Sequence, residues 1–205
     1  MPNKVIIIAE AGVNHNGDIS LAKKLIEKAA LSGADYVKFQ TFKATNLVTQ
    51  TARKAEYQIK NSKDGDDSQF KMLKNLEIPF ETHFELRDYA EKLGIKFLST
   101  GFDEEAIDFL DKLGVDLFKI SSGDITNKPY LTHVARLRKP IILSTGMATL
   151  EEVIAAIDIL TAQGITKKMI TVLHCNTEYP TPMKDVNLKA MLHIKNQLGV
   201  QVGFS

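Results

Sequence analysis

Short apolar runs rich in Val, Ile and Phe alternate along the chain with segments of helical periodicity. The runs are four to six residues long and cover residues 5–9, 36–40, 96–100, 117–121, 141–145, 170–175 and 202–205. Between them, apolar side chains recur every three or four residues, which predicts amphipathic helices around residues 21–29, 86–93, 106–113 and 150–160. A glycine that can adopt positive φ follows each helical segment: Gly33, Gly94, Gly114 and Gly164.

Strands that are buried on both faces and are each followed by a helix predict a parallel sheet. A (β/α)₈ TIM barrel and a doubly wound α/β sheet both fit this pattern. Polar residues stand at the carboxyl end of nearly every run, and a barrel gathers such residues at one mouth, so we favour the barrel. The seven runs then predict a barrel truncated after about seven strands, with residues 1–205 as one incomplete domain.

Residues 43–80 interrupt the alternation between the second run and the next helix, and they include a polar stretch at 62–68. Long insertions of this kind are often lids or binding loops, but they can equally be solvated excursions. The sequence leaves both interpretations open.

The residues at the strand ends have a chemistry suited to an anion. Lys38 and Lys119 lie in the second and fourth runs, and buried lysines are rare unless they are paired. Hydroxyl groups beside two ammonium groups, with glycines that let backbone N–H groups approach, form a good cradle for a phosphate. Glu10, after the first run, could move a proton. A single lysine at a strand end is more often a surface residue, so this interpretation rests on the pair.

The histidines carry weaker signals. His174 lies inside an apolar run and is either a hydrogen-bonded core residue or a functional one, which the sequence leaves open. His83, His133 and His193 fall in helical patterns, and we expect them at the surface. His15 stands in a turn with Asn and Gly, where we expect it to serve turn geometry.

Charge and cysteine content narrow the class of partner. The net charge is +1, so no basic field points to nucleic acid. The one cysteine, Cys175, allows no internal disulfide, which fits a reducing cytoplasm, and we expect it to be buried and inert. No apolar segment approaches the ~20 residues that a membrane span needs. We therefore expect a cytoplasmic protein that acts on small molecules.

The chain resembles the sialic acid synthase family along all of its 205 residues. The resemblance is carried by six motifs in order, which together are far more specific than any one alone. They lie at residues 8–17 (IAEAGVNHNG), 37–41 (VKFQT), 55–61 (AEYQIKN), 118–124 (FKISSGD), 142–147 (ILSTGM) and 173–182 (LHCNTEYPTP).

The resemblance implies a (β/α)₈ barrel that condenses phosphoenolpyruvate with an N-acetylated amino sugar, giving a nine-carbon 2-keto sugar acid and phosphate. It implies that Glu10 handles a proton or the attacking water. Phosphoenolpyruvate would be bound by Lys38, Thr100, Lys119, Ser122, Ser144 and Ser205. The sugar would be held by Gln40, Asp124 and Tyr179, with Asn61 as a further match in the loop. Phe102 and Asn176 complete the expected substrate-binding set.

The resemblance also implies a divalent metal, Mn²⁺ or Mg²⁺, and a homodimer. The two histidines that would bind this metal would lie beyond Ser205, one of them on an eighth strand that this chain does not contain. A small C-terminal antifreeze-like domain would follow. Two positions depart from the common family pattern: Asp124 stands where many members have Glu, and Gly101 where many have Pro.

Several functions remain open at this stage. The main interpretation is an N-acetylneuraminate synthase that uses N-acetylmannosamine. An alternative is a legionaminic acid synthase that uses a 2,4-diacetamido-trideoxy hexose. In the truncated form, the chain could instead be a non-catalytic fragment that still binds phosphate. A Schiff-base aldolase using Lys38 or Lys119 is a further option, which the hydroxyl-rich cradle disfavours.

Overall fold

A computed structural model describes residues 4–55, 59 and 66–205. The chain divides into two compact units, Met1–Ser99 and Thr100–Ser205. Within the described residues, no helix is long and apolar enough to cross a membrane.

Seven strands follow one another in the sheet in chain order, from β1 to β7, and the pairings are parallel. A doubly wound sheet would reverse its strand order at a switch point, whereas here each strand neighbours the next, as in a barrel. The parallel, seven-stranded (β/α) fold expected from the sequence is therefore confirmed. The strands are β1 (Ile8–Gly12), β2 (Tyr36–Thr41), β3 (Lys96–Gly101), β4 (Phe118–Ile120), β5 (Ile141–Ser144), β6 (Ile170–His174) and β7 (Gln201–Phe204).

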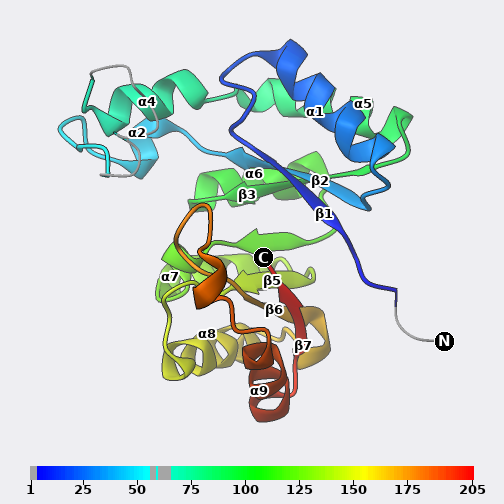
Figure 1. Ribbon diagram of the computed structural model, residues 1–205, viewed down its shortest axis with the longest axis vertical. Coiled ribbons are helices and arrows are strands. Elements are labelled where there is room, and N and C mark those ends of the chain that lie inside the picture. Colours follow the sequence, from blue (N-terminus) through cyan, green and yellow to red (C-terminus); the bar gives the residue numbers. More distant parts are fainter. Residues whose placement is uncertain (1–3, 56–58, 60–65) are drawn as a thin grey trace. The chain divides into compact units, whose positions relative to one another are not determined.

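The first unit carries β1, β2 and most of β3. Its helices are α1 (Ile19–Leu31), α2 (Ala44–Leu47), α4 (Gln69–Leu76) and α5 (Phe80–Lys92). Asp18 starts α1 by accepting hydrogen bonds from the backbone N–H groups of Ser20 and Leu21, which a helix cannot satisfy internally. Figure 1 shows α1 and α5 side by side over β1 and β2, where Ile26 and Leu86 are fully buried. The insertion at 43–80 contains the short helices α2 and α4. Whether it is a lid or a solvated excursion stays open.

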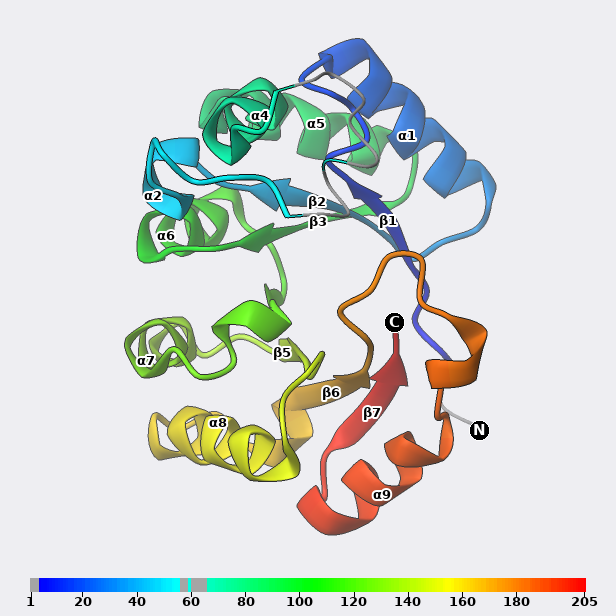
Figure 2. The same cartoon turned by 60° about the vertical axis from the view of Figure 1, so that its left-hand side comes forward.

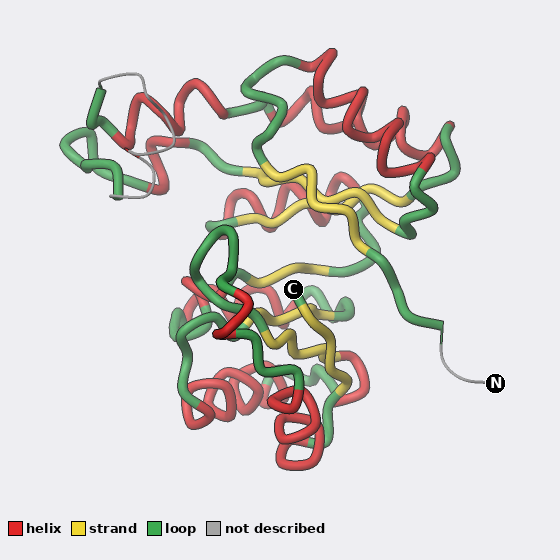
Figure 3. Tube along the Cα trace, viewed as in Figure 1, coloured by secondary structure: helices red, strands yellow, loops and turns green. Residues whose placement is uncertain are grey.

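The second unit carries the last residues of β3 and then β4 to β7. Its α-helices are α6 (Glu104–Leu113), α7 (Lys128–Arg136), α8 (Leu150–Ala162) and α9 (Lys189–Leu198), with 3₁₀ turns η1 (Ser122–Asp124), η2 (Lys167–Met169) and η3 (Met183–Asp185). Thr149 and Glu152 form a reciprocal capping box at the start of α8. Figure 2 shows α7 beside α8 and α9 beside β7. Figure 3 shows a long connection between β6 and α9, interrupted by η3.

Two expectations about individual residues were wrong. The first apolar run does not coincide with the first strand: Val5, Ile6 and Ile7 lie outside β1 and are 74%, 59% and 53% exposed. A continuous apolar run does not mark where pairing begins, so hydrophobicity alone misplaced this strand. His83 is 1% exposed rather than at the surface, because its Nε2 lies 2.9 Å from Thr41 Oγ1 and its Nδ1 lies 3.1 Å from the Pro79 carbonyl oxygen.

Candidate active site

In the first unit, Glu10 and Lys38 form an ion pair at neighbouring positions of β1 and β2. The two residues are in register, and Lys38 Nζ lies 2.6 Å from Glu10 Oε2. The Lys38 side chain is 12% exposed and that of Glu10 is 53% exposed, so the ammonium group is largely desolvated while the carboxylate faces solvent. A bulge between Glu10 and Gly12 shifts the register just after the pair. The ammonium group of this pair can bind an anion, and the carboxylate can exchange a proton with a bound substrate.

The turn after β1 holds His15 in one protonation form. His15 is fully buried, its Nδ1 accepts a hydrogen bond of 3.0 Å from the Gly17 backbone N–H, and Asn16 has φ +49°. Its role in turn geometry is thus confirmed. Because Nδ1 is an acceptor, Nε2 carries the hydrogen, and this Nε2 has no partner among the described residues. Burial lowers the His15 pKa, so the ring is neutral.

In the second unit, Lys119 and Ser144 make a short contact between β4 and β5. Lys119 Nζ donates to Ser144 Oγ at 2.6 Å and to the Ile120 carbonyl oxygen at 3.0 Å. Ser144 is 7% exposed, so the bond lies in a largely dry environment. Thr100 pairs with Lys119 in the sheet and is 3% exposed. An ammonium group with hydroxyls around it is the arrangement that suits a phosphate or carboxylate.

Asp124 lies next to this ammonium group, in η1. Burial raises the pKa of Asp124 to about 6, and the positive charge of Lys119 acts in the opposite direction. A carboxyl group with this pKa is partly protonated near neutral pH. It can therefore donate a hydrogen bond to a sugar carbonyl oxygen as well as accept one from an N–H or O–H group.

We expect the raised pKa of Asp124 to make the protein less stable as pH rises from about 4 to about 6. The folded state holds the Asp124 proton up to pH about 6, while the unfolded state releases it near 3.8. The unfolded state is therefore stabilised relative to the folded state as pH rises through this window. The free energy of unfolding falls by at most about 1–2 kcal/mol, because Asp124 is only partly buried and solvent screens its charge.

Urea unfolding of the complete protein at pH 4, 5, 6 and 7 measures this loss. Asp124→Asn should equal the wild type at pH 4 and exceed it at pH 7, because the amide has no charge to bury. Parallel pH profiles for the two proteins would show that the Asp124 carboxyl titrates in its ordinary range.

Ser122 and the loop after β5 meet at Gly146. Gly146 has φ +53°, and a Cβ placed there would lie 2.5 Å from Ser122 Cβ. We expected glycine backbone N–H groups to be available to the anion, but that of Gly146 donates to Cys175 Sγ at 3.2 Å. For Gly146 the expectation was therefore wrong, because a neighbouring strand end uses the amide. The sequence pattern did not indicate Cys175 as the acceptor for this amide.

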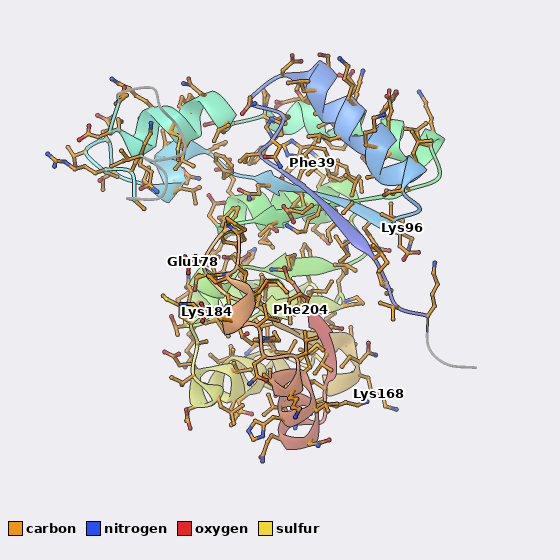
Figure 4. The ribbon with its side chains drawn as sticks, viewed as in Figure 1. Phe39, Lys96, Lys168, Glu178, Lys184 and Phe204 are labelled. Atoms are coloured by element: carbon orange, nitrogen blue, oxygen red, sulfur yellow. The ribbon has the colours of Figure 1, made fainter. Side chains whose placement is uncertain are left out.

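The next candidates follow the last two strands of the second unit. Asn176 Nδ2 donates to the Asp185 carbonyl oxygen at 3.4 Å, and the Ser205 backbone N–H donates to the His174 carbonyl oxygen at 3.0 Å. Tyr179 is 73% exposed. These residues follow the carboxyl ends of β6 and β7; Figure 4 shows Glu178 beyond the end of β6 and Lys168 before its start.

Three more candidates complete the set. Phe102 is half-buried directly after β3, and Gln40 is half-buried on β2. Asn61 lies outside the described residues. A single cavity shared by Glu10, Lys38, Lys119 and Ser144 stays a prediction.

The described residues do not by themselves fit a metal ion. No group of three or more His, Cys, Asp or Glu side chains among them could hold one. His174 Nε2 accepts a hydrogen bond of 3.2 Å from the Asn187 backbone N–H, so this ring nitrogen is already engaged within the chain. The expectation that the ligands lie beyond residue 205 stays a prediction.

Comparison with known proteins decides the family. A model of the NeuB family matches residues 25–205. The chain belongs to the NeuB family. Among curated NeuB relatives, it is 54% identical over 202 residues to N,N'-diacetyllegionaminic acid synthase of Campylobacter jejuni, and 52% identical over 201 residues to that of Legionella pneumophila. These alignments cover 98% and 97% of this chain, but 60% and 56% of the relatives.

More distant relatives and solved structures agree on family and fold. Human N-acetylneuraminate-9-phosphate synthase is 34% identical over 97% of this chain and 54% of its own length. A crystal structure of N-acetylneuraminic acid synthetase from Leptospira borgpetersenii superposes with a TM-score of 0.83 at 30% identity, over 98% of this chain and 65% of that one. The chain thus spans little more than half the length of the curated relatives above.

Proposed function

We propose that the protein condenses phosphoenolpyruvate with a 2,4-diacetamido-trideoxy hexose, giving a legionaminic-type 2-keto sugar acid and phosphate. The observation that carries the proposal is the identity of 54% and 52% to two N,N'-diacetyllegionaminic acid synthases, against 34% to the human N-acetylneuraminate-9-phosphate synthase. The comparisons therefore favour the legionaminic alternative over the N-acetylneuraminate interpretation. A divalent metal ion and a homodimer belong to the proposal as expectations from the family.

The second unit supplies the anion-binding part of the reaction. Lys119, already held against Ser144, would bind the phosphate or carboxylate of phosphoenolpyruvate. Ser122 and Thr100 would add hydroxyl donors. Asp124, with a pKa of about 6, would hold the sugar by hydrogen bonds.

The first unit supplies a carboxylate and an ammonium group. C3 of phosphoenolpyruvate forms the new bond to the aldehyde carbon of the sugar, and water then adds at C2. Glu10 would take a proton of that water, while Lys38, 2.6 Å from Glu10, would hold the carboxylate in orientation. Phosphate leaves from the resulting tetrahedral carbon as its C–O bond breaks and the C2 ketone forms. Of the two protons of the added water, one ends on the alkoxide that formed from the sugar aldehyde and the other on the released phosphate.

The experiment is a substrate comparison on the complete protein with Mn²⁺. Phosphate release and product mass are measured with phosphoenolpyruvate and either 2,4-diacetamido-2,4,6-trideoxymannose or N-acetylmannosamine. We expect kcat/KM to favour the diacetamido sugar by about 10²-fold, because a site built for the second acetamido group leaves polar groups unpaired with a hydroxyl there.

A preference for N-acetylmannosamine would return the assignment to N-acetylneuraminate synthase. Borohydride trapping of a pyruvate adduct on Lys38 or Lys119, without phosphate release, would instead show a Schiff-base aldolase.

A further inference from the structure

In the second unit, the loop after β5 is tied to the end of β6 by a short series of hydrogen bonds. Ser144 and Leu173 are paired in the sheet. Thr145 then donates to the Leu173 carbonyl oxygen through its backbone N–H at 3.3 Å and its hydroxyl at 2.9 Å. The Gly146 N–H continues the series by donating to Cys175 Sγ at 3.2 Å. The sulfur therefore anchors this loop where the sheet pairing ends.

The other side of Gly146 is pressed against Ser122. A Cβ at Gly146 would lie 2.5 Å from Ser122 Cβ and 2.6 Å from its Oγ, closer than real atoms approach. Ser122 Oγ has no hydrogen-bond partner among the described residues. Packing against the Gly146 backbone, rather than a hydrogen bond, thus determines where this hydroxyl lies and leaves it open to a ligand.

We propose that Cys175 is a positioning residue: its sulfur holds Gly146, and Gly146 holds the Ser122 hydroxyl in place to bind a phosphate or carboxylate oxygen of the substrate. The inference rests on the proposed function, in which Ser122 contacts phosphoenolpyruvate. Cys175 is 8% exposed, so it acts through the loop and not by touching the substrate. The effect on binding is selective, because small displacements of a donor weaken the contacts that the donor makes.

The test compares two substitutions of Cys175 in the complete protein. Cys175→Ala removes the acceptor, and we expect the KM for phosphoenolpyruvate to rise about tenfold, with the KM for the sugar changed less than about twofold. Cys175→Ser keeps an acceptor, so most of the affinity for phosphoenolpyruvate should return. Calorimetric titration with phosphoenolpyruvate measures the same loss without turnover.

A second pair of variants tests the contact with Ser122. Gly146→Ala drives a Cβ into Ser122, so its loss of phosphoenolpyruvate affinity should at least equal that of Cys175→Ala. Gly199→Ala is the matched control: it also imposes positive φ, +64°, on alanine, but nothing lies within 4 Å of the added Cβ. It should lower stability and leave the KM for phosphoenolpyruvate unchanged.

The outcomes distinguish failure of the positioning role of Cys175 from failure of the proposed function. Cys175→Ala with reduced thermal stability but wild-type affinity for phosphoenolpyruvate overturns the positioning role, and so does an equal rise in both KM values. If the wild-type protein does not bind phosphoenolpyruvate in the titration, the proposed function itself fails, and the positioning role with it. Wild-type binding with unaffected Cys175→Ala and Gly146→Ala variants rejects only the positioning role.

Discussion

Lys119→Met in the complete protein is expected to raise the KM for phosphoenolpyruvate by about 10- to 100-fold, the scale of a lost charge-assisted contact. The Lys119 ammonium group donates to Ser144 Oγ at 2.6 Å, and Ser144 is buried. Methionine has similar length but neither charge nor donor, so packing is kept while the anion loses its counter-charge. The pKa of Asp124 should also rise further, because Lys119 now lowers it.

Lys139→Met is the matched control for this prediction. Lys139 Nζ pairs with Asp111 Oδ1 at 2.7 Å and donates to the Val115 carbonyl oxygen at 2.8 Å in the same unit, but it precedes β5 instead of lying at a carboxyl strand end. Its loss should reduce stability without changing the KM for phosphoenolpyruvate. Steady-state kinetics on both variants decide the matter: an unchanged KM and normal turnover in Lys119→Met would refute the assignment of Lys119.

Residues 1–205 expressed on their own are expected to form no detectable product at any Mn²⁺ concentration. Their rate of product formation should lie at least about 10²-fold below that of the complete protein. They cover 60% and 56% of two legionaminic acid synthases, and their described part contains no group of three or more metal-binding side chains. β1 and β7 are terminal in the strand order, and terminal strands present unpaired backbone groups. Glu10 lies on β1 and Ser205 follows β7, so both would stand on such edges.

The measurement is product formation from phosphoenolpyruvate with either sugar, by mass spectrometry, in the short chain and in the complete protein. Circular dichroism of the short chain should be recorded alongside, so that lack of activity in a folded chain is told apart from lack of folding. Comparable rates in the two proteins would show that the metal site lies within residues 1–205.

Much of the fold follows from local pattern. Six of the seven apolar runs coincide with a strand to within about two residues, because a strand buried on both faces must be apolar throughout. The glycines at 33, 94, 114 and 164 all have positive φ, because few other residues can end a helix in that conformation. The start of β1 and the burial of His83 were not predicted, because they depend on which distant segments pack together.

The sequence by itself determined the order of strands and helices, the family motifs and the residue types at the strand ends, since these are properties of neighbouring positions. Only the tertiary structure decided which of those residues meet. It paired Glu10 with Lys38 and Lys119 with Ser144, and it raised the Asp124 pKa by burial. It also placed the Gly146 amide on Cys175. Hydrogen bonds, desolvation and close contacts form between residues far apart in the chain, and periodicity carries no information about them.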